Sequence, residues 1–274
     1  MVKRVKEYRT YFFDLDGTLV NGKTLFPYAK EIIAELTAQK KQLYFLTNHP
    51  IRSRKELKQH LQQMGLTVSM QQLLTPTLAI LEYFGEKQGP VSLYIVGSPM
   101  IKEEISREGL HLLHSSRDPV CGEVYVILGM APNIGYNQLQ EAFFLLQQGA
   151  RLVLLNPDLF CPTPNGLLLD TGSIARVLMN EKMDIHQAET VGKPSIWMQQ
   201  VLLKKIRHAR SRSVMIGDSL TSDIAIGQAV GIDTVLLYSG VTKKSSLEFV
   251  KQKPTYEYDS LKQLYEALKE VRYV

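Results

Sequence analysis

Short apolar runs alternate along the chain with longer segments in which apolar residues recur at helical spacing. The short runs predict strands at 10–14, 42–46, 92–96, 123–128, 151–155, 213–216 and 234–238. The helical spacing predicts helices at 28–40, 99–108, 136–148, 195–207, 221–230 and 260–270. A further helix begins at the capping box of Ser53 and Glu56 and stops at Gly65. This alternation is typical of an α/β fold with largely parallel sheets.

Composition and charge narrow the classes of function. The chain has 274 residues and a 45% hydrophobic content, which is enough for one large or two modest domains. Its net charge of +5 is spread without a long basic block, so no nucleic-acid partner is expected. No apolar run approaches membrane-spanning length, so no membrane partner is expected. Two cysteines exclude a disulfide framework and, with no leader-like apolar segment, predict a cytoplasmic protein.

Polar side chains follow several of the predicted strands. They are Asp14 and Asp16 after the first strand, Thr47 and Asn48 after the second, Asp218 and Asp223 after the strand at 213–216, and Lys193 before the helix at 195–207. In parallel α/β sheets, ligands bind outside the carboxyl ends of the strands. One edge of a sheet is therefore expected to gather acids, a hydroxyl, an amide and an ammonium group.

Acids gathered at one edge repel each other, and burial increases that cost. A divalent hard cation resolves the conflict, since carboxylate and carbonyl oxygens suit Mg²⁺, which also keeps phosphate oxygens among its ligands. One acid can then remain an ionised nucleophile while a neighbour moves protons. The hydroxyl, amide and ammonium groups match the oxygens of a phosphoryl group. The residues therefore favour phosphoryl chemistry supported by Mg²⁺.

Four segments of the chain carry a family resemblance. The segments "DLDGT" (14–18), "LTN" (46–48), "GKP" (192–194) and "GDSLTSD" (217–223) resemble the four motifs of the haloacid dehalogenase (HAD) superfamily phosphatases. The segments "GARLVLLNPD" (149–158) and "DTGSI" (170–174) resemble the subgroup with an α/β cap, which includes the NagD, p-nitrophenyl phosphatase and AraL types. The resemblance covers nearly the whole chain. It implies a Rossmann-like HAD core with a parallel sheet at 1–77 and 188–274, and an inserted α/β cap domain at 78–187.

The resemblance also implies a Mg²⁺-dependent phosphomonoesterase that hydrolyses small phosphorylated metabolites. Asp14 would attack phosphorus and form an aspartyl-phosphate, and Asp16 would protonate the leaving oxygen and then activate water. Mg²⁺ would be held by the Asp14 carboxylate, the Asp16 backbone carbonyl and Asp218. The groups expected to bind substrate are Thr47, Asn48, His49 and Lys193. Gly17 would let backbone amides approach the phosphate, and Asp223 would orient the metal's ligands.

Several alternatives stay open at this point. A phosphotransferase or mutase of the same superfamily would keep the aspartyl-phosphate and exclude water, and a non-catalytic binding protein could use the same fold. Sugar phosphates and nucleoside monophosphates lead as natural substrates, with p-nitrophenyl phosphate as an artificial one. His49 also fits a loop histidine without a role in the chemistry, and Cys161 a partly buried structural cysteine. Caps of this subgroup often mediate dimers, so a homodimer through the cap is left open.

Overall fold

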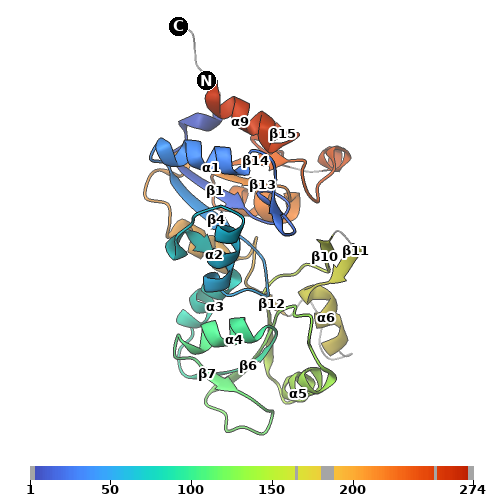
Figure 1. Cartoon of the computed structure of the whole chain (residues 1–274). Helices are drawn as coiled ribbons and strands as arrows, with labels where there is room; N and C mark the ends of the chain where they lie inside the picture. Colours follow the sequence, from blue (N-terminus) through green and yellow to red (C-terminus); the bar gives the residue numbers. More distant parts are fainter. Residues whose placement is uncertain (1–3, 164–165, 180–187, 250–251, 271–274) are drawn as a thin grey trace. The chain divides into compact units, whose positions relative to one another are not determined.

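The computed structural model describes residues 4–163, 166–179, 188–249 and 252–270 (Figure 1). These residues form two compact units. The first unit lies within residues 1–47, 58–74 and 199–274, and the second within 48–57 and 75–198. The predicted cap range, 78–187, falls inside the second unit. The boundaries of the predicted core and cap stay predictions.

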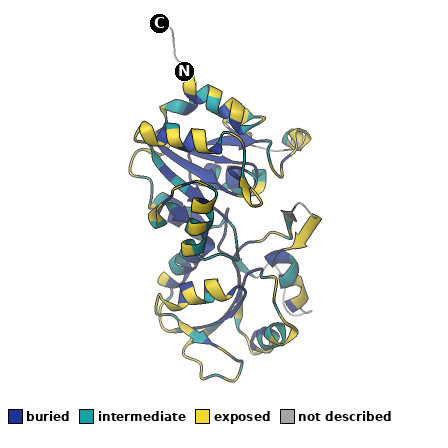
Figure 2. Ribbon diagram, viewed as in Figure 1, coloured by how far each residue is buried: buried dark blue, intermediate teal, exposed yellow. Residues whose placement is uncertain are grey.

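A six-stranded sheet forms the centre of the first unit, and all its neighbouring strands are parallel. Its strands, in spatial order, are β15 (Tyr256–Tyr258), β14 (Asp233–Leu237), β13 (Ser213–Gly217), β1 (Thr10–Asp14), β4 (Gln42–Leu46) and β5 (Leu73–Leu74). All five residues of β1 are buried, as expected for a central strand of a parallel sheet (Figure 2). The Phe12 ring stacks on Tyr44 across the β1–β4 pair, which helps to fix the register.

Helices and turns of the first unit flank this sheet. The α-helices are α1 (Ala29–Ala38), α8 (Ala225–Ala229) and α9 (Leu261–Lys269). The shorter elements are the 3₁₀ turns Val5–Glu7, Met70–Gln72, Arg210–Arg212 and Lys244–Phe249, and a π turn, η5 (Leu220–Ile224). A small antiparallel hairpin of β2 (Val20–Asn21) and β3 (Thr24–Leu25) follows β1 directly. Helices α2 (Arg54–Gln63) and α7 (Ile196–Leu203) have residues in both units.

The second unit is built on a five-stranded parallel sheet. Its strands, in spatial order, are β12 (Glu189–Thr190), β9 (Arg151–Leu154), β8 (Glu123–Leu128), β6 (Val91–Val96) and β7 (His111–Leu113). A separate antiparallel hairpin joins β10 (Phe160–Thr163) to β11 (Gly166–Leu169). The helices are α3 (Pro76–Gly85), α4 (Pro99–Ser106), α5 (Tyr136–Gln147) and α6 (Thr171–Leu178).

One core cluster of the second unit contains buried residues of its sheet and of α5 and α6. Ala142, Leu145 and Leu146 of α5 are buried there, and Leu139 and Phe143 pack against the same cluster. The apolar face of α5 is therefore part of the core. No helix among the described residues is long and apolar enough to cross a membrane.

The structure confirms the predicted fold class, a mixed α/β fold with parallel sheets. Strands β1, β4 and β8 have the predicted bounds. The capping box at Ser53 is also confirmed, because its backbone N–H donates to Glu56 Oε2 at 3.2 Å and the Glu56 N–H donates to Ser53 Oγ at 3.4 Å. One predicted helix, 221–230, is divided, since its first part is the π turn η5 and only 225–229 is α-helical.

Candidate active site

Three carboxylates meet at the carboxyl edge of the six-stranded sheet. Asp14 is the last residue of β1, Asp218 follows the neighbouring strand β13, and Asp223 lies in the π turn after it. Each offers a carboxylate oxygen, and these oxygens all lie within 4.8 Å of one another. The three residues are only 5%, 3% and 1% exposed. Buried acids at this spacing strongly favour a bound cation, because each would otherwise raise the cost of ionising the others.

The Asp218 carboxylate is held from two sides. The Thr18 hydroxyl donates to its Oδ1 at 3.1 Å, and the backbone N–H of Val241 donates to its Oδ2 at 2.7 Å. A Cβ at Gly17 would lie 2.7 Å from Asp218 Oδ2, and a Cβ at Gly240 would come closer still. The two hydrogen bonds and the close approach of two glycines therefore restrict the orientation of this side chain.

The turn after β1 presents Asp16, which is exposed, in contrast to the buried Asp14. Gly17 has a φ of 91°, a left-handed conformation that few other residues adopt. Its N–H donates to Val20 O at 2.9 Å, and its own carbonyl accepts from the Ser239 hydroxyl at 2.7 Å. The backbone around Asp16 is thus fixed on both sides while its side chain reaches solvent.

Asp223 is fixed by the turn in which it lies. The backbone N–H of Ser219 donates to Asp223 Oδ2 at 3.1 Å, and the N–H of Asp223 donates back to Ser219 O at 3.0 Å. The Asp223 side chain also packs against the backbone of Gly217, where a Cβ would collide with it. Its carboxylate is therefore available to the cluster in a defined position, either as a ligand or as a group that orients one.

Thr47 follows β4 and is 1% exposed. Its N–H donates to Leu74 O at 3.1 Å, and its hydroxyl lies 3.5 Å from Asp16 Oδ2, at the outer limit of a hydrogen bond. The first unit thus brings together five of the predicted site residues, from β1, β4 and β13 and the turns after them: Asp14, Asp16, Thr47, Asp218 and Asp223.

The second unit holds Asn48 and Lys193 together. The Asn48 side chain accepts from the Lys193 N–H at 2.7 Å through Oδ1 and donates to the Lys193 carbonyl at 3.1 Å through Nδ2. Lys193 is only 2% exposed, and few lysines are buried to this extent without a function or a charged partner. The pairing joins two motifs that are 145 residues apart in the sequence.

His49 closes a tight turn within the second unit. Its Nδ1 accepts from the backbone N–H groups of Ile51 at 3.2 Å and Arg52 at 3.4 Å. Its Nε2 lies 2.9 Å from Nη1 of Arg52. These contacts give the ring a local structural role, and the predicted substrate contact of His49 stays a prediction.

The contacts of two segments, at Asn156 and at 239–242, were not predicted from the sequence. Asn156, predicted only to mark the subgroup, is 1% exposed and donates to the backbone carbonyl of Asn48 at 3.1 Å. The segment Ser239–Thr242 supplies the hydrogen bonds to the Gly17 carbonyl and to the Asp218 carboxylate. A signal for this segment was present, because it comes after the predicted strand at 234–238, at the same edge of the sheet as the acids.

Two family models match the chain. The model described as haloacid dehalogenase-like hydrolase matches residues 11–111, and a second model of HAD-like hydrolases matches residues 190–264. Together they contain Asp14, Asp16, Thr47, Lys193 and Asp218. The chain belongs to the haloacid dehalogenase-like hydrolases and is an enzyme of that family.

Curated relatives and solved structures agree with this assignment. The chain is 28% identical over 257 residues to the 5'-nucleotidase YutF of Bacillus subtilis, covering 94% of this chain and 97% of the relative. It is 28% identical over 258 residues to an acid sugar phosphatase of Staphylococcus haemolyticus, covering 94% and 95%. The p-nitrophenyl phosphatase from Archaeoglobus fulgidus superposes with a TM-score of 0.82 at 27% identity, covering 95% of this chain and 99% of that one. NagD from E. coli K-12, at 24% identity and a TM-score of 0.80, covering 93% and 97%, shows the same fold.

Proposed function

We propose that this chain is a Mg²⁺-dependent phosphomonoesterase that acts on small phosphorylated metabolites through an aspartyl-phosphate. The observation that carries the proposal is the buried trio of Asp14, Asp218 and Asp223, with carboxylate oxygens within 4.8 Å of one another. The relatives named as a nucleotidase and as sugar and p-nitrophenyl phosphatases support the same class of reaction.

The donor set fits a hard divalent cation, since it consists of oxygen atoms and includes no thiolate or imidazole. Asp14, Asp218 and the Asp16 backbone carbonyl would hold the ion, with Asp223 beside them. When bound, Mg²⁺ supplies charge neutralisation for the phosphoryl oxygens and for the acids. A structural neighbour of 25% identity, a glycerol phosphate phosphatase from Mycobacterium tuberculosis, was solved in complex with calcium, which supports a divalent-metal site.

Asp14 and Asp16 then have different roles in the proposed reaction. The Asp14 carboxylate attacks phosphorus in line with the leaving oxygen, and the bond to that oxygen breaks as the aspartyl-phosphate forms. Asp16, on its fixed turn and open to solvent, gives its proton to the leaving oxygen. Asp16 then takes a proton from the water that attacks the intermediate, so phosphate is released and Asp14 is regenerated.

Thr47, Asn48, His49 and Lys193 form the proposed substrate-binding set. The Thr47 hydroxyl and the Lys193 ammonium group bind phosphoryl oxygens, and Lys193 also offsets the repulsion between Asp14 and the anionic substrate. Asn48 fixes the Lys193 backbone through the paired hydrogen bonds. We propose sugar phosphates or nucleoside monophosphates as substrates, and action in the cytoplasm, with any dimer formed through the cap.

Phosphate release tests the proposal directly. p-Nitrophenyl phosphate, a panel of sugar phosphates and a panel of nucleoside 5'-monophosphates are incubated with the protein and Mg²⁺, with and without EDTA. We expect many turnovers per protein with Mg²⁺ and none with EDTA, restored by added Mg²⁺. Transfer of phosphate to an acceptor without release into water would identify a phosphotransferase instead.

The role of Asp16 is tested by burst kinetics. Asp16→Asn is expected to release up to one p-nitrophenol per protein, because this leaving group needs little protonation, and then to turn over very slowly. Asp14→Asn should show no burst. Steady turnover by Asp16→Asn at the rate of the unmodified protein would contradict the proton-transfer role.

A further inference from the structure

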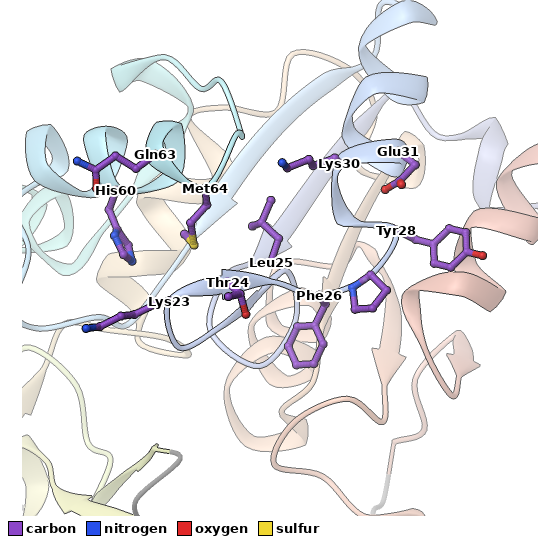
Figure 3. Close-up of a pocket in the computed structure, with 11 residues that line it drawn as sticks. Lys23, Thr24, Leu25, Phe26, Tyr28, Lys30, Glu31, His60, Gln63 and Met64 are labelled. Carbon is purple, nitrogen blue, oxygen red and sulfur yellow. The ribbon is translucent and has the colours of Figure 1, made fainter.

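A cavity of about 540 Å³ lies in the first unit (Figure 3). Its walls come from the β2–β3 hairpin and the segment after it, from the start of α1, and from the end of α2. The lining contains none of the residues assigned to the phosphoryl chemistry. Its volume is within the range of about 300–1,000 Å³ that is common for small-molecule sites.

The lining combines an apolar wall with positive charge. The apolar residues are Leu25, Phe26, Pro27, Tyr28 and Met64. The charged groups are Lys23 and Lys30, against the single carboxylate of Glu31, with the titratable His60 nearby. Such a lining fits a molecule with an apolar body and one acidic group. The apolar body contacts the hydrophobic wall and the acidic group pairs with a lysine, whereas a neutral ligand would make only the first kind of contact.

The two lysines come from different walls. Lys23 lies at the tip of the hairpin, and Lys30 lies in the first turn of α1. Figure 3 shows Lys30 extending from α1 toward Met64, while His60 extends from α2 toward the hairpin. The Lys30 ammonium group lies over Gly65, where a side chain would displace it and where the carbonyls at the end of α2 favour a cation. The Lys30 ammonium group is thus close to the end of α2 and available to an acidic ligand in the cavity.

The hairpin wall is bonded to the turn that carries Asp16. In the hairpin, Val20 pairs with Leu25, and the Val20 carbonyl accepts from the Gly17 N–H at 2.9 Å. Asp16 and Val20 form a β-bridge, and the N–H of Phe26 donates to Leu19 O at 2.9 Å. The hairpin wall of the cavity is therefore joined by backbone hydrogen bonds to both sides of the Asp16 turn.

We propose that this cavity is a second ligand site, for a small molecule with an apolar body and one acidic group, and that its occupant is coupled to the Asp16 turn through the β2–β3 hairpin. Because the Asp16 carbonyl would hold the cation and its turn is bonded to the hairpin that lines the cavity, each ligand favours the arrangement of this turn that the other binds, and each tightens the binding of the other.

The binding claim is tested with 2-naphthoate, which has an apolar body and a carboxylate and no phosphoryl group. Its dissociation constant is measured by calorimetry in the presence of EDTA, so this part does not depend on the proposed phosphatase function. We expect Lys23→Glu to weaken binding at least about tenfold and Met64→Trp, which fills the cavity, to abolish it. Lys55→Glu is the matched control, since Lys55 is exposed on α2 outside the lining, and it should change binding by less than about twofold.

Three results would overturn the site. They are equal losses in Lys23→Glu and Lys55→Glu, which would indicate general charge attraction; equal affinity for the neutral 2-naphthamide; and unchanged binding in Met64→Trp. A circular dichroism spectrum of each variant confirms that it is folded, and Met64→Leu, which conserves size and polarity, should bind normally.

The coupling claim rests on the proposed metal site and is tested separately. The 2-naphthoate dissociation constant is measured with EDTA and with saturating Mg²⁺, and the Mg²⁺ constant with and without 2-naphthoate. We expect both to tighten by the same factor, of about threefold or more, since linkage is reciprocal. If 2-naphthoate binds with the same affinity with and without Mg²⁺, the second site is supported and the coupling is contradicted. If Mg²⁺ does not bind at all, the result contradicts the proposed function instead.

Discussion

The two parallel sheets of this molecule are alike in their cores and differ at the carboxyl ends of their strands. In the first unit, Tyr11, Phe12 and Phe13 of β1 are fully buried, as are Tyr125 and Val126 of β8 in the second. The difference begins where the strands end. In the first sheet, β1 ends at Asp14, and Asp218 directly follows β13, so both acids lie at the carboxyl edge.

Two strands of the second sheet, β6 and β9, are followed by neutral residues that hold a helix start or a loop. Strand β6 is followed by Gly97 and Ser98, and the Ser98 hydroxyl caps α4 by accepting from the Met100 N–H at 3.2 Å. Strand β9 is followed closely by Asn156, which bonds to Asn48 and, at 3.3 Å, to Asp170. We infer that the same architecture supports the proposed chemistry where its strands end in acids, and acts as a scaffold where they end in neutral groups that hold loops.

The largest expected effect separates the two kinds of buried acid. Asp14→Asn should reduce phosphate release on the order of a thousandfold or more, because an amide cannot attack phosphorus, while the melting temperature stays close to that of the unmodified protein. Asp170→Asn is the matched control. Asp170 is 4% exposed and caps α6 by accepting from the Thr171 N–H at 2.6 Å, a role that Asn fills about as well.

Steady-state kinetics and thermal melts of both variants check this contrast. Asp170→Asn should keep turnover within about threefold. Equal losses of turnover in the two variants would show that any buried carboxylate matters equally and would remove the distinction between the two sheets.

A smaller effect is expected from crowding the acid cluster without removing an acid. A Cβ at Gly240 would collide with the Asp218 carboxylate, so Gly240→Ala should displace this group and weaken Mg²⁺ binding by about 10–100-fold, the range seen when the supports of metal ligands are lost. Gly135→Ala is the control, since no atom lies within 4 Å of the Cβ it would add. Calorimetric titration with Mg²⁺ measures both, and equal constants for the two variants would contradict the role of the 239–242 segment.

The strand-end acids could be predicted from the sequence because two local signals coincide there. An apolar run fixes the end of β1 at Asp14, and the rule for parallel sheets then places the polar residues after the strand at the ligand-binding edge. The same reasoning finds Asp218 after β13. Neither step needs knowledge of long-range contacts, which is why residues far apart in the sequence could be assigned to one edge.

Other parts of the fold and site carry no such signal. Strands β2 and β3 have two residues each, too few for a period to show. Leu167, Leu168 and Leu169 of β11 are all exposed, although a run of three apolar residues in the sequence predicts a buried strand. The pairing of Asn48 with Lys193 depends on backbone hydrogen bonds between motifs distant in the sequence, and residue types alone do not specify it.

The smallest expected effect lies at the end of the second sheet. Asn156→Ala removes the side-chain donor to Asn48 O at 3.1 Å and the acceptor of the Asp158 N–H at 3.1 Å, leaving polar groups without these partners. Because the site is buried, we expect a loss of about 1–3 kcal/mol in the free energy of unfolding, measured by urea denaturation. Asn133→Ala, at an exposed turn, should cost less than about 0.5 kcal/mol.

The kinetic readout of Asn156→Ala decides whether this edge is only a scaffold. If Asn156 acts through the position of Asn48, the Michaelis constant should rise by a few-fold while kcat stays within about threefold, since the acids of the first sheet are untouched. A fall in kcat comparable with that of Asp14→Asn would instead place Asn156 among the reacting groups. The second sheet would then contribute to the chemistry directly, and the contrast between acidic and neutral strand ends would no longer explain where the reaction takes place.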